Sequence, residues 1–355
     1  MKILKNLISY CTVVFAAVLM LSCTQPVEEG ITSFVPGEVE NPVTISQAII
    51  KDPNFSTLEK LMRLIQDAAT TPEGRILANL NLPGNTTVFA PTDAAFKAYM
   101  NANNIADISK LPIATITNLV YNHLLTGKFL AADFSNGFVS TQASRGTGAS
   151  KVFLSMYVNT TDGVQLNAVS KVVSSNLTLN NGVIHTVDAV INVPTVRDLI
   201  AMNPATSTFN TAINHGDTST PTKVISIALS NATVSVTAFA PTNAAFSSVL
   251  LELDPTGLTT SVTQLTAVRV ANMSRMQIVS TAASTPPISS DLFVPRSNTA
   301  LQTLLAGSVG RVNFNGTLKT IKDPRARTAN ITPLDIQGSN GVVHTVDKVM
   351  LPVTL

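Results

Sequence analysis

The sequence predicts two similar domains in tandem, each of mixed helix and strand. The stretch TVFAPTDAAF at 87–96 returns as TAFAPTNAAF at 237–246, and NGVIHTVDAVI at 181–191 returns as NGVVHTVDKVM at 340–350. We call these pairs the first and second signatures. Each half also opens with apolar residues at helical spacing and ends in short apolar runs bounded by Gly and Asn. Solenoid and propeller repeats are only ~20–50 residues long, so the repeating unit is a whole domain.

Composition is that of a globular chain long enough for two cores. The sequence has 355 residues, of which 45% are hydrophobic and 12% are charged, and domains typically hold ~100–150 residues. Tryptophan is absent and aromatic residues make up 5%, so we expect cores built from aliphatic side chains. The formal charge of +2 is too small a basic surplus to favour nucleic acid as a partner.

The first 22 residues are expected to be an export signal. Two lysines precede an apolar run at 7–21, which is shorter than the ~18–20 apolar residues of a membrane-spanning helix. Ser22-Cys23 resembles the lipobox of bacterial lipoproteins, which implies cleavage before Cys23 and attachment of lipid to it. A secretory signal cleaved elsewhere is the alternative. Cleavage before Cys23 also removes Cys11 and leaves 21 basic and 21 acidic residues, so the folded part would be neutral and without disulfides.

Residues 23–42 are expected to form a flexible acidic tether. The segment is polar, contains Pro26 and Pro36, and has glutamates as its charged residues, a composition that buries too little apolar surface to fold alone. Acidic residues after a lipidated cysteine resemble signals that direct lipoproteins to the outer face of the outer membrane. The expected location is therefore the outer membrane or cell surface, with the chain anchored through Cys23.

The two signatures resemble those of fasciclin-like (FAS1) domains. In that family a Phe-Ala-Pro-Thr turn leads into a short helix, and an Asn-Gly-x-x-His-x-x-Asp strand lies near the end of the domain. The matching residues are Phe89, Pro91, Thr92, His185 and Asp188 in the first repeat and Phe239, Pro241, Thr242, His344 and Asp347 in the second. The resemblance implies domains at 43–193 and 195–355, each with an α+β fold in which a β-sandwich or wedge is flanked by short helices.

The junction between the two domains is short. About two residues around Pro194 separate the repeats. We therefore expect a close interface between the domains rather than a flexible linker.

The first signature predicts a strand that ends at a proline and a helix capped by a threonine. Pro91 lacks the backbone donor that a strand needs, and Thr92 stands where a helix N-cap belongs. Asp93 would lie at the positive end of the helix dipole, but the second repeat has Asn243 there. Because one copy lacks the charge, we interpret Asp93 as structural rather than catalytic.

The second signature predicts a tight turn at its Asn-Gly followed by a strand. Alternation along that strand places His185 on one face with Val183 and Val187. A histidine on such a face is more often a satisfied, partly buried imidazole than a ligand or base. Our hypothesis is that His185 and His344 each hydrogen-bond to the backbone or threonine of the Phe-Ala-Pro-Thr turn in their own domain.

A helix between the signatures departs from the family pattern. The family often has a Tyr-His pair there, which Tyr121-Asn122-His123 approximates with one residue inserted, whereas the corresponding part of the second repeat has no histidine. Tyr121 and His123, with Leu124, resemble the partner-binding helix of the family. The alternative interpretation places the tyrosine and the leucine in the core.

The sequence contains none of the motifs that would indicate an enzyme or a metal site. It has no Gly-x-Ser-x-Gly elbow, and residues three apart on a strand, such as His185 and Asp188, point to opposite faces. The four histidines do not have the spacing of metal ligands. We therefore expect no catalytic residues, no metal and no cofactor.

A basic cluster in the second repeat is a further candidate surface. It consists of Lys319, Lys322, Arg325 and Arg327. Such a cluster would suit an acidic polysaccharide or an anionic membrane. The alternative is the solvated face of a hairpin.

The family resemblance implies a non-enzymatic adhesion protein at the cell surface, anchored by lipid. Its partner would be a glycan, a matrix protein or another copy of the chain, because relatives in this family mostly act in adhesion. The alternative is an accessory ligand-binding lipoprotein of an outer-membrane nutrient-uptake system. A neighbouring transporter gene would favour this alternative.

Overall fold

A computed structural model describes residues 43–146, 151–282, 287–289, 298–332 and 335–355. The predicted export signal, Cys23 and the tether lie outside these residues. Within the described ranges, no helix has the length and hydropathy needed to cross a membrane. The same ranges contain no cluster of three His, Cys, Asp or Glu side chains that could hold a metal ion.

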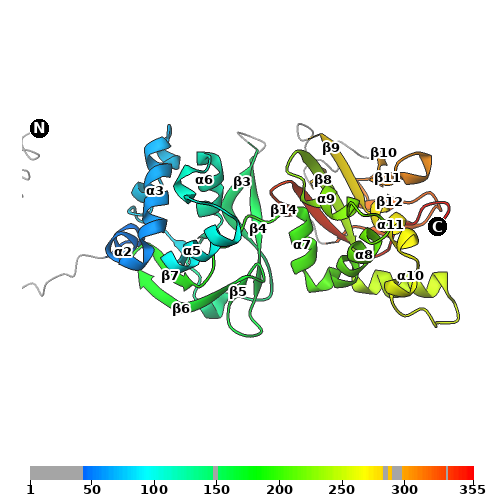
Figure 1. Cartoon of the computed structure of the whole chain (residues 1–355), viewed down its shortest axis with the longest axis horizontal. Coiled ribbons are helices and arrows are strands. Elements are labelled where there is room, and N and C mark those ends of the chain that lie inside the picture. Colours follow the sequence, from blue (N-terminus) through cyan, green and yellow to red (C-terminus); the bar gives the residue numbers. More distant parts are fainter. Residues whose placement is uncertain (1–42, 147–150, 283–286, 290–297, 333–334) are drawn as a thin grey trace, which may run out of the picture. The chain divides into compact units, whose positions relative to one another are not determined.

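The first domain places its helices on one face of a seven-stranded sheet (Figure 1). The helices are α2 (Ile45–Lys51), α3 (Ser56–Ala68), α4 (Ile76–Asn79), α5 (Asp93–Ala102) and α6 (Ile113–Tyr121). The strands are β1 (Thr86–Pro91), β2 (Leu124–Thr126), β3 (Gly137–Arg145), β4 (Val152–Asn159), β5 (Gln165–Leu166), β6 (Ser170–Leu179) and β7 (Gly182–Val187). Their order in the sheet is β2-β1-β7-β6-β5-β4-β3.

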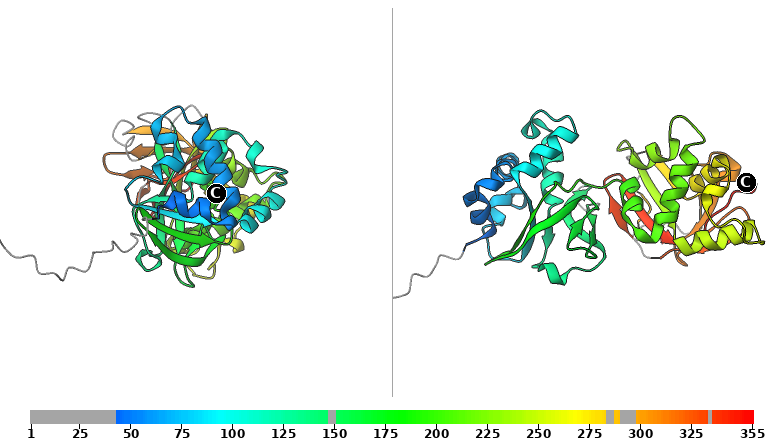
Figure 2. Two further views of the ribbon diagram at one scale, coloured as in Figure 1. Left: turned by 90° about the vertical axis from the view of Figure 1, so that its left-hand side faces the viewer. Right: turned by 60° about the horizontal axis from the view of Figure 1, so that its bottom comes forward.

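The second domain repeats this plan with two four-stranded sheets (Figure 1 and Figure 2). The helices are α7 (Val196–Met202), α8 (Ser207–Asp217), α9 (Val224–Ser230), α10 (Asn243–Leu253) and α11 (Ala267–Met276). The strands are β8 (Val234–Pro241), β9 (Ile278–Ala282), β10 (Thr299–Gln302), β11 (Arg311–Asn315), β12 (Thr320–Lys322), β13 (Thr328–Asn330), β14 (Ile336–Gly338) and β15 (Gly341–Val346). The sheet orders are β14-β15-β8-β9 and β10-β11-β12-β13.

Apolar clusters on the two faces of the sheet form the core of the first domain. Successive residues of β1 point to opposite faces, so Val88 packs with the helices while Phe89 packs on the other side. The cluster around Phe89 also contains Met156 of β4 and Leu166 of β5, from the far half of the same sheet. The sheet therefore folds over itself and forms the sandwich that the family resemblance implied.

In each domain the two signatures lie side by side as parallel strands. Thr86 pairs with Gly182 at the start of β1 and β7, and Pro91 pairs with Val187 at their end. A Cβ atom on Gly182 would collide with the carbonyl oxygen of Thr86, which explains the glycine. The second domain pairs β8 with β15 in the same way, from Val236 opposite Gly341 onward.

The tight turn differs from the prediction by one residue. Leu179 pairs with Gly182, so the two-residue loop consists of Asn180 and Asn181. The Asn-Gly pair is therefore not the centre of the turn. Its asparagine is the last loop residue, and its glycine is the first residue of the strand.

The asparagine of the second signature is a buried connector. Asn181 is 3% exposed; its Oδ1 accepts from the N–H of Ile45 at 2.9 Å, and its Nδ2 donates to the carbonyls of Leu80 and Leu82 at 2.6 and 3.0 Å. In the second domain, Asn340 makes the equivalent bonds at 2.9, 2.9 and 3.2 Å. The residues bonded to Asn340 are Val196, Leu229 and Asn231. One amide thus fixes the start of α2 or α7 to the sheet.

The two domains contact one another through strands β3, β4 and β14. The backbone N–H of Gln337 donates to Ser155 Oγ at 2.9 Å, and the guanidinium of Arg145 donates to Gln337 Oε1 at 2.5 Å. These hydrogen bonds add to the short connection through Pro194.

We predict that Asn181→Ala destabilises the first domain by about 3 kcal/mol, because it removes three hydrogen bonds worth ~0.5–1.5 kcal/mol each and leaves the buried N–H of Ile45 without its acceptor. The matched control is Asn101→Ala, at an exposed helical position, which should change stability by less than ~0.5 kcal/mol. All tyrosines after the predicted signal lie in the first domain, at 99, 121 and 157, and tryptophan is absent. Tyrosine fluorescence during urea unfolding therefore reports on this domain, and equal midpoints for the two variants would contradict the connector role.

Candidate functional site

The first signature forms a strand-to-helix joint with a threonine cap. Thr92 Oγ1 accepts from the N–H of Ala95 at 3.2 Å, and Thr242 Oγ1 accepts from the N–H of Ala245 at the same distance. The strand before each cap ends at proline because proline cannot continue the ladder. Both copies therefore use this signature to turn the chain from strand to helix.

Asp93 and Asn243 hold the same neighbouring helix in their respective domains. Asp93 accepts from the hydroxyl of Ser56 at 2.6 Å and the N–H of Thr57 at 2.8 Å. Burial acts to raise the pKa of Asp93, but the hydrogen bonds from Ser56 and Thr57 outweigh it and lower the pKa. Asn243 Oδ1 accepts equivalent bonds from Ser207 and Thr208, at 3.2 and 2.9 Å. An acceptor oxygen satisfies the site, so the negative charge is dispensable.

The histidines of the second signature do not hydrogen-bond to the Phe-Ala-Pro-Thr turn, which corrects our hypothesis. His185 Nε2 donates to the carbonyl of Phe129 at 2.9 Å, and its Nδ1 accepts from the N–H of Asn176 at 3.2 Å. His344 does the same with Ile288 at 2.6 Å and Asp335 at 3.2 Å. Both imidazoles are fully buried, and burial lowers the pKa of each.

The two signatures are instead joined through the loop residue that each histidine binds. The N–H of Phe129 donates to Thr87 Oγ1 at 2.9 Å, so Phe129 is held by one residue from each signature. In the second domain the N–H of Ile288 donates to Thr237 Oγ1 at 2.8 Å. Each histidine also stacks on the phenylalanine of the turn, with ring centroids 5.5 Å apart for Phe89 and 5.7 Å apart for Phe239.

The aspartates of the second signature bind backbone. Asp188 Oδ1 accepts from the N–H of Lys171 at 2.7 Å. Asp347 accepts from the N–H and the side-chain amide of Asn330, both at 2.7 Å. Each carboxylate therefore holds the neighbouring strand next to its own.

His123 is a buried side chain that joins two backbone segments, a role that we call a pin. It is not part of an exposed partner-binding helix. It is 2% exposed; its Nδ1 donates to the carbonyl of Leu119 at 2.8 Å, and its Nε2 accepts from the N–H of Ile191 at 2.9 Å. Both ring nitrogens are occupied by backbone groups that require the neutral ring. Burial accordingly lowers the pKa of His123 to about 4, although the bond to Leu119 opposes this.

Gln277 takes the place of His123 in the second domain, a replacement that the sequence analysis missed. Gln277 is fully buried, and its Nε2 donates to the carbonyls of Met273 and Met350, both at 2.8 Å. Its Oε1 accepts from the N–H of Met350 at 3.2 Å. The equivalence is clear from the sheet, because the carbonyl of His123 binds the N–H of Phe89 and that of Gln277 binds the N–H of Phe239.

The other residues of the proposed partner-binding helix also face the interior. Leu124 is 1% exposed and belongs to the helix-side core. Tyr121 packs partly buried against the same cluster, and its hydroxyl lies 3.4 Å from the carbonyl oxygen of Glu73. Burial raises the pKa of Tyr121. This arrangement matches the alternative that assigned the tyrosine and the leucine to the core.

Of the predicted basic cluster, Arg327 is neutralised and Arg325 is bound to backbone. Arg327 forms ion pairs with Asp323 at 2.7 Å and Glu252 at 2.8 Å, and its guanidinium donates to the carbonyl of Val349 at 2.8 Å. Arg325 donates to the carbonyl of Pro352 at 2.7 Å. These arginines hold the C-terminal segment, and Lys319, Lys322 and Arg325 are the exposed cations of the group.

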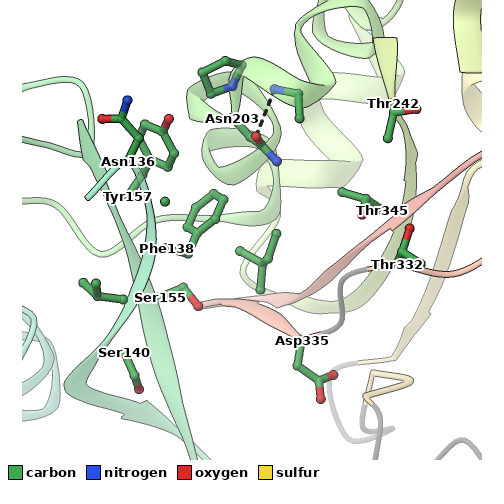
Figure 3. A pocket seen from close by; sticks show the side chains of 15 residues that line it. Asn136, Phe138, Ser140, Ser155, Tyr157, Asn203, Thr242, Thr332, Asp335 and Thr345 are labelled. Carbon is green, nitrogen blue, oxygen red and sulfur yellow. Dashed lines mark hydrogen bonds between the residues drawn. The ribbon is translucent and has the colours of Figure 1, made fainter. Parts of the chain in front are cut away.

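A cavity of about 820 Å³ combines residues of both domains (Figure 3). Phe138 and Tyr157 of β3 and β4 line one side, and Thr345 of β15 lines the other. Asn203 lies between α7 and the next short helix, with its Oδ1 accepting from the N–H of Ala205 at 3.1 Å. No pattern in the sequence indicated this cavity, because its residues are far apart along the chain.

Comparison with known proteins identifies the repeated unit. A family model described as "Fasciclin domain" matches residues 53–194 and 204–352. Among solved structures, a FAS1 domain pair from the insect cell adhesion molecule fasciclin I aligns with a TM-score of 0.46 and 16% identity, covering 84% of this chain and 97% of that one. The two matched regions confirm the tandem pair that the repeats predict.

Curated relatives share parts of the chain. Over 154 residues it is 29% identical to a fasciclin-like arabinogalactan protein of Arthroderma benhamiae, covering 43% of this chain and 32% of that protein. Over 275 residues it is 23% identical to human periostin, covering 76% of this chain and 28% of periostin. Over 157 residues it is 28% identical to an uncharacterised Synechocystis protein, covering 41% of this chain and 96% of that protein. The chain thus spans about a third of the fungal and human proteins.

We predict that His123→Gln folds with nearly unchanged stability, whereas His123→Leu loses about 3 kcal/mol. Glutamine can bond the same backbone groups, as Gln277 does in the second domain, but leucine leaves a buried carbonyl and a buried N–H unsatisfied. Urea unfolding at pH 7, followed by tyrosine fluorescence, measures both variants. Equal losses in the two variants would contradict the pin role.

We predict that acidification weakens the first domain and that His123→Gln reduces this effect. A histidine with a folded pKa of about 4 and an unfolded pKa of ~6.5 binds its proton more readily in the unfolded state. Its contribution to stability is therefore complete above pH 6.5 and is lost as pH falls toward 4. The free energy of unfolding of the variant should fall about 3 kcal/mol less between pH 7 and pH 4, at 1.36 kcal/mol per pKa unit. Urea unfolding at pH 7, 5.5 and 4 measures this, and parallel curves would contradict it.

Proposed function

Because the chain belongs to the fasciclin domain family, we propose that it is a non-enzymatic binding protein of the cell surface, which contacts an extracellular glycan or protein. The observation that carries this proposal is that the signature side chains are bonded to the protein's own backbone and strands. Both ring nitrogens of His185 and His344 are bonded to backbone groups, and Asp188 and Asp347 bind a neighbouring strand. Groups that an enzyme would need for proton transfer hold the scaffold here, which supports binding over catalysis.

We further propose that the chain is anchored by lipid on Cys23 and presented at the outer membrane or cell surface. This part of the proposal is supported by the lipobox-like Ser22-Cys23 and the acidic segment that follows it. A tether of ~20 residues would let the domains reach past the membrane surface while the lipid retains them. Contact with another copy of the chain is an additional candidate interaction at such a surface.

A second candidate is an accessory ligand-binding lipoprotein of an outer-membrane nutrient-uptake system. The cavity of about 820 Å³ favours it, because a transporter accessory must hold a small molecule and pass it on. A transporter encoded beside this chain would support uptake, and an isolated locus would support adhesion.

We predict that Cys23→Ser moves the protein from the membrane fraction to the soluble exported fraction, because the lipid attachment atom is lost. Cells carrying the wild-type chain should adhere several-fold better than cells without it to at least one surface on an array of matrix proteins and glycans. Cells carrying Cys23→Ser should adhere at the background level. Fractionation, protease treatment of intact cells and counting of adherent cells measure these outcomes.

Purified Cys23→Ser is the control for folding, because it should bind the same array surface as the detergent-solubilised wild type. Unchanged fractionation of Cys23→Ser would contradict the anchor. Failure of surface-exposed wild type to bind any array surface would contradict the adhesion role.

A further inference from the structure

We propose that the cavity shown in Figure 3 binds a short, neutral oligosaccharide. This inference rests on the proposed binding function and names a site and a ligand class for it. The cavity volume of about 820 Å³ lies within the range of ~300–1,000 Å³ that is typical of small-molecule sites. An aromatic wall, fixed amide donors, a buried hydroxyl and the charge of the lining together define the ligand.

The aromatic wall is formed by Phe138 and Tyr157. Their ring centroids are 5.1 Å apart, with the ring planes inclined at 64°, and Tyr157 is 7% exposed. Such packed rings give a rigid apolar surface with a phenolic hydroxyl at its edge. A sugar ring suits this surface, because its C–H groups form an apolar face and its hydroxyls project around the rim.

Two asparagines provide fixed hydrogen-bond donors at the cavity. Asn136 Oδ1 accepts from the N–H and the hydroxyl of Thr160, at 2.6 and 3.1 Å, and Asn203 Oδ1 accepts from the N–H of Ala205 at 3.1 Å. Because each oxygen is held by a backbone donor, the orientation of each amide is set. Their NH₂ groups are then available as donors to ligand hydroxyls.

Thr345 supplies the observation that points most directly to a ligand. It lines the cavity, is 3% exposed, and its Oγ1 is buried without a hydrogen-bond partner among the described residues. A buried hydroxyl left without a partner destabilises the protein. A ligand hydroxyl that reaches it would satisfy both groups, which favours a polyhydroxylated ligand.

The charge of the lining selects a neutral ligand. Among the described residues that line the cavity there is no Lys, Arg or His, and Asp335 is the only charged one. A uronate, sulfate or phosphate group would bring a second negative charge close to this carboxylate, which repels it. Neutral sugar hydroxyls avoid that repulsion.

An extended peptide fits the site less well. A peptide that adds a strand to a sheet needs unpaired backbone groups at the edge. β14 is an edge strand beside the cavity, but the N–H of Gln337 at its centre already donates to Ser155 Oγ at 2.9 Å. The edge is therefore blocked where such a peptide would have to pair.

The test is isothermal titration of the full chain in detergent with neutral trisaccharides of glucose, mannose, galactose or xylose, beside a uronate trisaccharide and an extended peptide. At least one neutral trisaccharide should bind, and more tightly than the uronate or the peptide. Thr345→Val, which removes the hydroxyl with little change of shape, should weaken that binding at least tenfold. Thr345→Ser keeps the hydroxyl and should restore it.

The repeat provides a matched control in Thr186→Val, since Thr186 holds the same place in the first copy of the signature and does not line the cavity. It should bind as the wild type does, and thermal unfolding followed by circular dichroism checks that each variant is folded. Three results would overturn the proposal: no binding of any neutral trisaccharide, binding by Thr345→Val within twofold of wild type, or tighter binding of the uronate or the peptide. The array adhesion measurement separates the two proposals. If cells adhere to an array surface but no neutral trisaccharide binds in the titrations, the saccharide site is contradicted and the adhesion role is not.

Discussion

The parallel pairing of the two signature strands is the constraint on which the rest of each domain depends. β1 and β7 are separated by most of the domain in sequence, yet they pair from Thr86 opposite Gly182 to Pro91 opposite Val187. Their pairing places Phe89 beside His185 in one core and Val88 beside Ile184 in the other. The buried side chain of Asn181, just before β7, then binds Ile45, and that of His123 binds Ile191, just after β7. Repetition of the signatures is therefore repetition of the one contact that closes the domain.

The sequence was sufficient for the parts of the fold that follow from local rules or from internal duplication. Strand alternation places His185 and Ile184 on opposite faces, as the clusters show. The replacement of Asp93 by Asn243 indicated that the charge was dispensable, and the equivalent hydrogen bonds explain why. In the second case the chain provided its own comparison, because the two copies of the domain differ at this position and both residues supply an acceptor oxygen.

Long-range hydrogen bonds could not be predicted from the same patterns. The imidazole of His185 binds the carbonyl of Phe129, a loop residue that nothing in the sequence distinguishes. His123 matched a family pattern, and its replacement Gln277 is hard to recognise because it lies 38 residues after Phe239, whereas His123 lies 34 after Phe89. Nor could the sequence indicate a cavity whose walls come from β3, β4 and β15, since such a site depends on how the domains fold and pack.

The positions of Asn181 and His123 determine how the first domain would carry mechanical load. Ile45 near its beginning is tied to Asn181, and Ile191 near its end is tied to His123. Both attachments lie at the ends of the short segment that contains β7. Tension applied to the chain on either side of the domain would pass mainly along this segment and its parallel partner β1, where the strands resist shear through several hydrogen bonds at once. The helices and the outer strands lie outside that path, so their surfaces would keep their shape while the chain is under tension.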